Sequence, residues 1–178
     1  MTSAHVVWKN GKLITYGPTD AGDAATDLLA TSIAVSGDDI YTAMYSSDDS
    51  QDKSDIKLWK NGRPLMGIGN NGTGANASCL VVDGNDVYAC GSEDRMTDPA
   101  RRLVISVPRI WKNGKVMKIG RMEEEGHVNS MTVAGGKLYA AGSSGNNAAL
   151  WTDGICEPLG KKNCRCNGSK VIAMPAKN

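Results

Sequence analysis

The chain has 178 residues, of which 40% are apolar, and a formal net charge of +1. This length allows one domain with a sizeable core, and the near-neutral charge argues against nucleic acid or an anionic membrane as a partner. There is no run of 18 apolar residues, and the N-terminus lacks the charged and apolar regions of a signal peptide. We therefore expect a soluble protein, either cytoplasmic or a secreted form without its leader.

Two phrases alternate along the chain, and each occurs four times. The first phrase reads VVWKNGKLITYG at 6–17, KLWKNGRPLMGIG at 57–69, RIWKNGKVMKIG at 109–120 and ALWTDGICEPLG at 149–160. The second reads TSIAVSGDDIYTAMY at 31–45, SCLVVDGNDVYACG at 78–91, NSMTVAGGKLYAAG at 129–142 and KNCRCNGSKVIAMP at 162–175. The four repeats open at the only tryptophans of the chain, Trp8, Trp59, Trp111 and Trp151.

Both phrases are predicted to be β-hairpins, eight in all. The Asn-Gly or Asp-Gly pair of the first phrase suits a type I′ turn, in which both central residues need positive φ. The second phrase places glycine first, as at Gly37, Gly84 and Gly135, which suits a type II′ turn. Basic residues beside the Asn-Gly turns, Lys60 and Lys112 among them, are expected to be solvated charges that protect an edge strand.

The positions of two prolines predict which strand is outermost. Counting from the Asn61-Gly62 turn, Trp59 faces Pro64 in a pair without hydrogen bonds, and Pro158 reaches a similar position in the last repeat. Because proline has no N–H to donate, it is tolerated there only on an edge. The strand that follows each tryptophan phrase is therefore predicted to be the outer edge of its sheet.

The predicted fold is all-β, a four-bladed β-propeller formed by one domain over residues 1–178. Pairs of hairpins give four-stranded antiparallel blades, and repeated blades close radially. The chain starts with an outer hairpin and ends with an inner one at 162–175, so pairing of the two terminal hairpins would close the ring. Each tryptophan is expected to pack between neighbouring blades. We expect a closed monomer; the alternatives are a β-sandwich and a part of a larger ring.

These phrases resemble a WKNG-type β-propeller repeat of uncharacterised bacterial proteins, with a strand order similar to the kelch type. The resemblance covers nearly the whole chain and implies a propeller, but it implies no chemistry. The kelch double glycine is not kept. Gly91 and Gly142 are single glycines, and Met44 and Pro175 stand at the corresponding places of the other repeats.

The links between phrases vary in length and are expected to lie together on one side of the ring, which we call the loop face. They hold most of the acidic residues and a minority of the basic ones, so this face is predicted to be net negative. Variable loops on a rigid scaffold are common binding sites. The candidate ligand-binding residues are Asp48, Asp49, Asp52, Asp55, Arg101, Arg102, Glu123, Glu124, Glu125 and His127.

The sequence favours a non-enzymatic binding or scaffold protein that recognises a protein or a glycan through the loop face. It has no GxSxG, HExxH or Walker motif, and its histidines are His5 and His127. We predict no catalytic residue, no metal site and no cofactor, and no nucleic-acid or membrane partner. One alternative is a carbohydrate-active enzyme, because a ring can bring distant carboxylates together. The other is a structural propeller that assembles into a larger ring.

Cys79 and Cys90 are predicted to be cross-strand neighbours, counting from the glycine turn between them. A hydrogen-bonded pair has a Cα separation of about 5.5 Å, which a disulfide can span. Five cysteines is an odd number, and the N-terminus does not read as a leader sequence. We therefore expect two reduced thiols that serve as small core residues.

Overall fold

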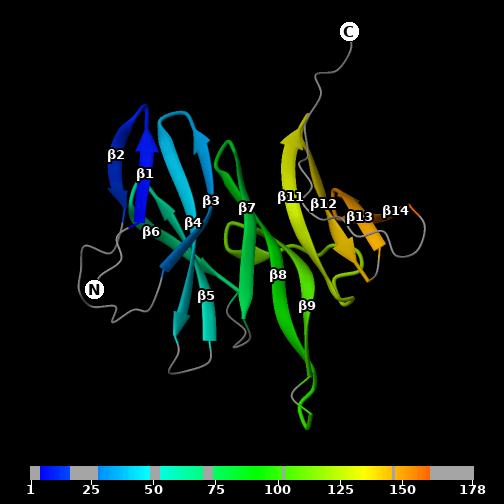
Figure 1. Ribbon diagram of the computed structural model, residues 1–178. Coiled ribbons are helices and arrows are strands. Elements are labelled where there is room, and N and C mark those ends of the chain that lie inside the picture. Colours follow the sequence, from blue (N-terminus) through cyan, green and yellow to red (C-terminus); the bar gives the residue numbers. More distant parts are fainter. Residues whose placement is uncertain are drawn as a thin grey trace.

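The computed structural model describes residues 5–16, 28–48, 53–69, 74–101, 103–145 and 147–160. Within these ranges the protein is all-β, with antiparallel strands and no helix, and hence no helix that could span a membrane. Figure 1 shows the sheets side by side in chain order, from the blue N-terminal hairpin to the orange strands near residue 160.

The described strands form one hairpin and three four-stranded sheets. The hairpin is β1 (His5–Lys9) and β2 (Lys12–Tyr16). Sheet 1 has β3 (Leu28–Ser36), β4 (Asp39–Asp48), β5 (Lys53–Lys60) and β6 (Arg63–Ile68) in that order. Sheet 2 has β7 (Ala75–Asp83), β8 (Asp86–Asp98), β9 (Leu103–Lys112) and β10 (Lys115–Val116) in that order. Sheet 3 has β11 (Gly126–Ala134), β12 (Lys137–Ser144), β13 (Asn147–Thr152) and β14 (Ile155–Leu159) in that order.

Seven of the eight predicted hairpins fall within the described residues, and all seven are present. The eighth, at 162–175, lies outside the described residues. In each tryptophan phrase both central turn residues have positive φ, for example 49° at Asn61 and 77° at Gly62. The predicted type I′ geometry is therefore confirmed at these turns.

The turns of the second phrase agree with the prediction in two described copies and differ in the third. At Gly37 and Gly84 the glycine has a φ of 58° and the next residue is not in the positive region, as type II′ requires. At Gly135 and Gly136 both φ values are positive, 58° and 74°. The prediction of type II′ is wrong there, because a second glycine has no Cβ to oppose the type I′ conformation.

The proline positions confirm the predicted edges. Trp59 pairs with Pro64 and Ala149 pairs with Pro158 in the observed registers. The strands that carry these prolines, β6 and β14, are the outermost strands of their sheets. The missing N–H of each proline therefore interrupts no ladder within its sheet.

Three tryptophans pack between neighbouring sheets, as predicted. Trp111 of sheet 2 is 1% exposed and lies in one cluster with Leu58 of sheet 1. Trp151 of sheet 3 is also 1% exposed and lies in one cluster with Ile110 of sheet 2. Trp59 is also buried, and Val7 of the first hairpin packs against its cluster. Each of these three side chains removes a large apolar area from water at the boundary between two sheets. For Trp8 the prediction is wrong within the described residues, because its side chain is 67% exposed.

A set of hydrogen bonds joins the two phrases within each sheet. In sheet 1 the backbone N–H of Ile40 donates to the side-chain oxygen of Asn61, and the backbone N–H of Asn61 donates to the Ile40 carbonyl oxygen, both at 2.8 Å. The Asn61 side-chain N–H donates to Asp39 at 2.7 Å. The Lys60 ammonium lies 2.8 Å from the same carboxylate and 5.3 Å from the ring centre of Tyr41. We call this arrangement the turn lock.

The turn lock recurs in the other two sheets. Sheet 2 repeats it, with distances of 2.7 to 2.9 Å, through Asp86, Val87, Lys112 and Asn113. In sheet 3 Asp153 replaces the asparagine and accepts the N–H of Leu138 at 2.9 Å. Its own backbone N–H donates to the Leu138 carbonyl oxygen at 2.8 Å. The two phrases therefore recur together because each supplies half of the lock.

The turn lock also shifts the acidity of its charged members. Hydrogen bonds from the Lys60 ammonium and then from the Asn61 amide lower the pKa of Asp39, and Asp39 raises the pKa of Lys60. The stabilisation from Asp39 is lost as the pH falls through its lowered folded pKa, and that from Lys60 is lost as the pH rises through its raised folded pKa. Lys60 and Lys112, expected to be solvated charges, are thus ion-paired.

A disulfide joins Cys79 of β7 to Cys90 of β8, with a Cα separation of 5.3 Å. The predicted cross-strand pairing is confirmed, and the predicted reduced state is wrong. The parity of the cysteine count carries no information about which two side chains meet. Here the register places the two cysteines opposite each other on the face that packs towards sheet 3, so their sulfurs come together.

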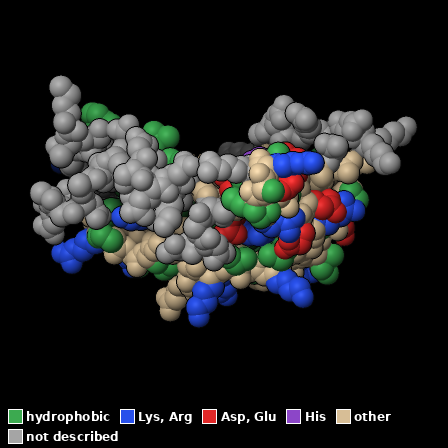
Figure 2. Space-filling view, turned by 90° about the horizontal axis from the view of Figure 1, so that it is seen from below, with side chains coloured by type: hydrophobic (Ala, Val, Ile, Leu, Met, Phe, Trp, Pro, Cys, Tyr) green, Lys and Arg blue, Asp and Glu red, His purple; other side chains and the backbone are tan. Residues whose placement is uncertain are grey.

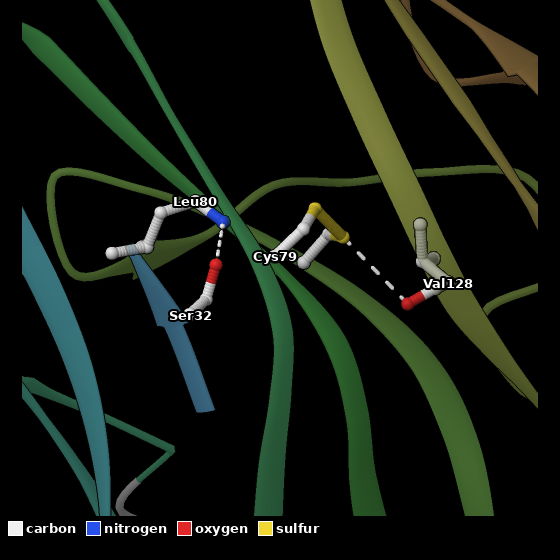
Figure 3. Close-up of a disulfide and its surroundings, with 5 residues drawn as sticks. Ser32, Cys79, Leu80 and Val128 are labelled. Carbon is white, nitrogen blue, oxygen red and sulfur yellow. Dashed lines mark hydrogen bonds between the residues drawn. A yellow bond between two sulfur atoms is a disulfide. The ribbon is translucent and has the colours of Figure 1, made fainter. Parts of the chain in front are cut away.

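The first strands of the three sheets, β3, β7 and β11, are neighbours. The backbone N–H of Leu80 donates to the Ser32 hydroxyl oxygen at 3.0 Å (Figure 3). On the other side, the Cys90 sulfur lies 3.6 Å from the Val128 carbonyl oxygen (Figure 3). A disulfide sulfur carries no hydrogen, so this second approach is a packing contact. Sheet 2 is thereby held against a neighbour on each side.

Replacing Asn61 by glycine tests the turn lock, because glycine keeps the positive φ and removes the side chain. We expect Asn61→Gly to lower the free energy of unfolding by about 1 kcal/mol, because it loses the part-buried hydrogen bond from Ile40, whereas the exposed bond to Asp39 adds little. Urea unfolding followed by tryptophan fluorescence measures this change. Asn113→Gly should give a similar loss in sheet 2, and full stability in both variants would contradict the lock.

Candidate functional site

A pocket of about 350 Å³ opens on the loop face. It is lined by Tyr45, Ala75, Asn76, Ser92, Asp94, Ser106 and His127. These residues belong to β4, β7, β8, β9 and β11, so all three four-stranded sheets contribute. An aromatic ring, an amide, a carboxylate, an imidazole and two hydroxyls together suit a polar ligand. We call this the loop-face pocket.

Two single glycines fix the strand ends that carry Asn76 and His127. A Cβ at Gly91 would collide with the carbonyl oxygen of Asn76, and a Cβ at Gly142 would collide with that of His127. Immediately after these two residues, β7 and β11 each contain a register shift typical of a β-bulge. The two glycines therefore permit the close backbone approach that positions Asn76 in sheet 2 and His127 in sheet 3.

Asp94 is held in place by its own strand pair. It lies opposite Ser106 in the register of β8 and β9, and the Ser106 hydroxyl donates to one Asp94 carboxylate oxygen at 2.6 Å. The Asp94 backbone N–H donates to the carbonyl oxygen of Gly74 at 2.7 Å. The pocket therefore contains a carboxylate whose orientation is set before any ligand arrives.

The carboxylates of the described part of the loop face mostly have arginine partners. Three exposed ion pairs lie here, namely Arg95 with Glu123, Arg101 with Asp98 at 3.7 Å, and Arg121 with Glu124 at 3.5 Å. Figure 2 views this side from below and shows acidic and basic side chains next to one another. Three carboxylates of the described loop face are thus neutralised locally, and the net negative charge of the whole face stays a prediction.

One further ion pair is buried beside the pocket. Glu93 is 4% and Arg109 is 7% exposed, and the Arg109 Nε lies 2.8 Å from a Glu93 carboxylate oxygen. The Arg109 Nη1 donates to the carbonyl oxygens of Pro108 at 3.1 Å and of Met122 at 2.7 Å. This pair ties β8 and β9 to the link that precedes β11. No local sequence pattern indicates this pair, because the two residues lie 16 positions apart.

Among the candidate residues chosen from the sequence, His127 lines the pocket. Arg101 lies at the tip of the hairpin between β8 and β9, next to Asp98. The acidic residues before β11 contact neighbouring strands. Glu123 pairs with Arg95 of β8, and Glu124 accepts a hydrogen bond from the Ser144 hydroxyl of β12 at 3.2 Å. The backbone carbonyl of Glu125 accepts the N–H of Gly145 at 2.7 Å. Their role as ligand contacts stays a prediction.

The remaining candidates cannot be related to the pocket through their side chains. Asp49, Asp52 and Arg102 lie outside the described residues. Asp48 is the last residue of β4 and Asp55 lies within β5, where the backbone alone is described.

Most of the pocket residues lie in the links between the phrases, but they were missed because the sequence analysis chose other, mainly charged residues of these links. Asn76 and His127 occupy the same position of their repeats, one residue before the partners of Gly91 and Gly142. Tyr45 and Ser92 likewise share a repeat position. Aligning the repeats on their glycines and reading off the positions where residue type varies would have found these four residues.

Among the described residues that line the pocket, Asp94 is the one carboxylate. Glycoside hydrolysis usually needs two carboxyl groups on either side of the bond. Within the described segments, no three His, Cys, Asp or Glu side chains are grouped so that they could hold a metal ion.

No protein-family model, no curated protein and no solved structure matches this chain. The loop-face pocket and the chemistry of its residues are therefore what indicates a function.

Removing the buried guanidinium of Arg109 should destabilise the folded chain. We expect Arg109→Met to lower the free energy of unfolding by about 3 kcal/mol, since the Glu93 carboxylate stays buried without this partner. Urea unfolding measures the loss, and Glu93→Gln together with Arg109→Met should recover part of it. Arg101→Met is the control: its ion pair is exposed, so a loss below about 0.5 kcal/mol is expected. Equal losses in the two single variants would contradict the proposed importance of the buried pair.

Proposed function

We propose that this chain is a closed four-bladed β-propeller of the WKNG type that acts as a non-enzymatic binding protein and holds a glycan in its loop-face pocket. In this proposal the inner hairpin at 162–175 completes a fourth blade with β1 and β2. The ring is a monomer, and the pocket lies at the mouth of its centre. The pocket itself is the observation that carries the proposal.

The uncovered apolar surface supports closure by the chain's own C-terminal hairpin. Trp8 is 67% exposed, although its counterparts in the three sheets are buried. On β3, Leu29, Ile33 and Val35 are each more than half exposed. These side chains lie on the first hairpin and on sheet 1, where a completed fourth blade would pack. Large apolar side chains left exposed on contacting elements mark an interaction surface, so an occupant is expected.

The turn lock offers the fourth blade a defined connection. Asn10 has the φ of the other lock asparagines, 51°, and Val171 occupies the place of Ile40 in the repeat. Lys170 stands where sheet 1 has Asp39, as Lys137 does in sheet 3. We therefore infer a lock of the sheet 3 kind, made of amide hydrogen bonds between Asn10 and Val171.

A glycan fits the loop-face pocket better than a protein surface does. A partner protein usually docks on a flat patch of about 800 Å² on each side, whereas this site is a hollow near the lower end of small-ligand pockets. Tyr45 supplies a ring against which a sugar face can stack, and Asn76, Asp94 and His127 supply hydrogen-bonding groups for hydroxyls. The single carboxylate argues for recognition without cleavage.

Closure is tested by comparing two equivalent asparagines. We expect Asn10→Gly to lower the free energy of unfolding by about 1 kcal/mol, as Asn61→Gly does, because both lose one lock. Light scattering after size-exclusion chromatography should give the mass of one chain. Unchanged stability in Asn10→Gly together with the mass of a dimer would point instead to a structural unit that assembles into a larger ring.

Glycan recognition is tested by isothermal titration calorimetry with oligosaccharides selected from a glycan array. We expect Tyr45→Ala and His127→Ala each to weaken binding about tenfold or more, because stacking and hydrogen bonds are lost in the pocket. Lys12→Ala is the control and should bind normally, because Lys12 begins β2 beside the Asn10-Gly11 turn and is not part of the pocket lining. Binding that both pocket variants leave unchanged would refute the site. Release of shorter sugars from a bound oligosaccharide would show an enzyme instead.

A further inference from the structure

Among the described residues, the lining of the loop-face pocket has one fixed negative group and no lysine or arginine. Asp94 is part of the lining, and its orientation is set by the 2.6 Å hydrogen bond from Ser106. A carboxylate can accept about four hydrogen bonds, so the bond from Ser106 leaves room for donors of a ligand. The pocket therefore favours a ligand that brings hydrogen-bond donors or positive charge.

The arginines nearest in sequence to Asp94 and Ser106 are already engaged elsewhere. Arg95 pairs with Glu123 and also donates to the Glu123 carbonyl oxygen at 2.8 Å. Arg109 is buried against Glu93 and donates to two carbonyl oxygens. Neither of these two guanidinium groups is therefore free to offset the repulsion between Asp94 and a carboxylate or sulfate on a ligand.

Tyr45 adds a second feature suited to a cation. It lies on β4 of sheet 1 and lines the pocket together with Asp94 of sheet 2. A cation within about 6 Å of an aromatic ring is attracted by the negative face of the ring, and the attraction grows when water is excluded. A carboxylate and an aromatic ring in one polar pocket form a recurring combination for an ammonium group.

We propose that the loop-face pocket selects a sugar that carries a free ammonium group, that is, a non-acetylated amino sugar. This inference rests on the proposed glycan-binding function. The ammonium donates to the Asp94 carboxylate and lies against the Tyr45 ring. The ring hydroxyls bind Asn76, Ser92 and His127. Neutral sugars keep the hydroxyl contacts alone, and acidic sugars are repelled.

Two oligosaccharides that differ only in the amine test this proposal. Fully deacetylated and fully N-acetylated glucosamine oligomers of equal length are titrated by calorimetry into the full chain at pH 6. We expect the deacetylated oligomer to bind about tenfold more tightly, as a charge-assisted hydrogen bond implies. Asp94→Asn keeps an acceptor for the Ser106 hydroxyl and should abolish the difference in affinity between the two oligomers. Glu157→Gln removes a similar charge on β14 and should preserve it.

The outcomes separate this inference from the glycan-binding proposal. Equal affinity for the two oligomers, in a protein that binds sugars through Tyr45 and His127, would overturn the charge selectivity and leave glycan binding intact. A preference that survives in Asp94→Asn would show non-specific attraction of a polycation, and it would also overturn the inference. Failure of both oligomers and of every array glycan to bind would overturn both proposals.

Discussion

The turn lock is the constraint on which the rest of the arrangement depends. Hairpins are marginally stable by themselves, and each sheet here is made of two of them. The asparagine of the outer turn, such as Asn61, accepts the backbone N–H of Ile40 with its side chain and donates its own backbone N–H to the Ile40 carbonyl oxygen. These two bonds fix the register in which the two hairpins pair. Only asparagine or aspartate combines this acceptor with tolerance of positive φ, which explains why Asp153 is the one replacement seen.

From that fixed end, register carries through to the opposite end of each sheet, where the pocket lies. Regular pairing is interrupted at the bulges of β7 and β11. The backbones approach closely there, and only glycine fits at Gly91 and Gly142. Sheet 1 has Met44 at the same place, fully buried, and contributes an aromatic ring in the next position. The three sheets thus share a scaffold and differ where they meet, which is how a repeat protein acquires an asymmetric site.

Much of the scaffold could be predicted because its signals are local. Asn-Gly turns, the two edge prolines and the tryptophan spacing each depend on a few adjacent residues, and the observed registers follow from them. The pocket depends on residues from three sheets, and no local pattern brings Tyr45 and His127 together. The ion pair between Glu93 and Arg109 escaped for the same reason. Only part of the disulfide could be predicted. The hairpin register places Cys79 opposite Cys90, whereas the bond itself depends on how the two side chains pack and not on the number of cysteines.

The position of the disulfide has a consequence for the order of assembly. Cys79 and Cys90 are 11 residues apart and belong to one hairpin, so the bond needs only β7 and β8 to have met. Closing so short a loop is fast compared with joining strands from distant parts of a chain. The hairpin that becomes covalently fixed is also the one that contacts sheets 1 and 3 through its first strand. In an oxidising environment we therefore expect the β7–β8 hairpin in the middle of the chain to form first, with the sheets on either side added to it afterwards.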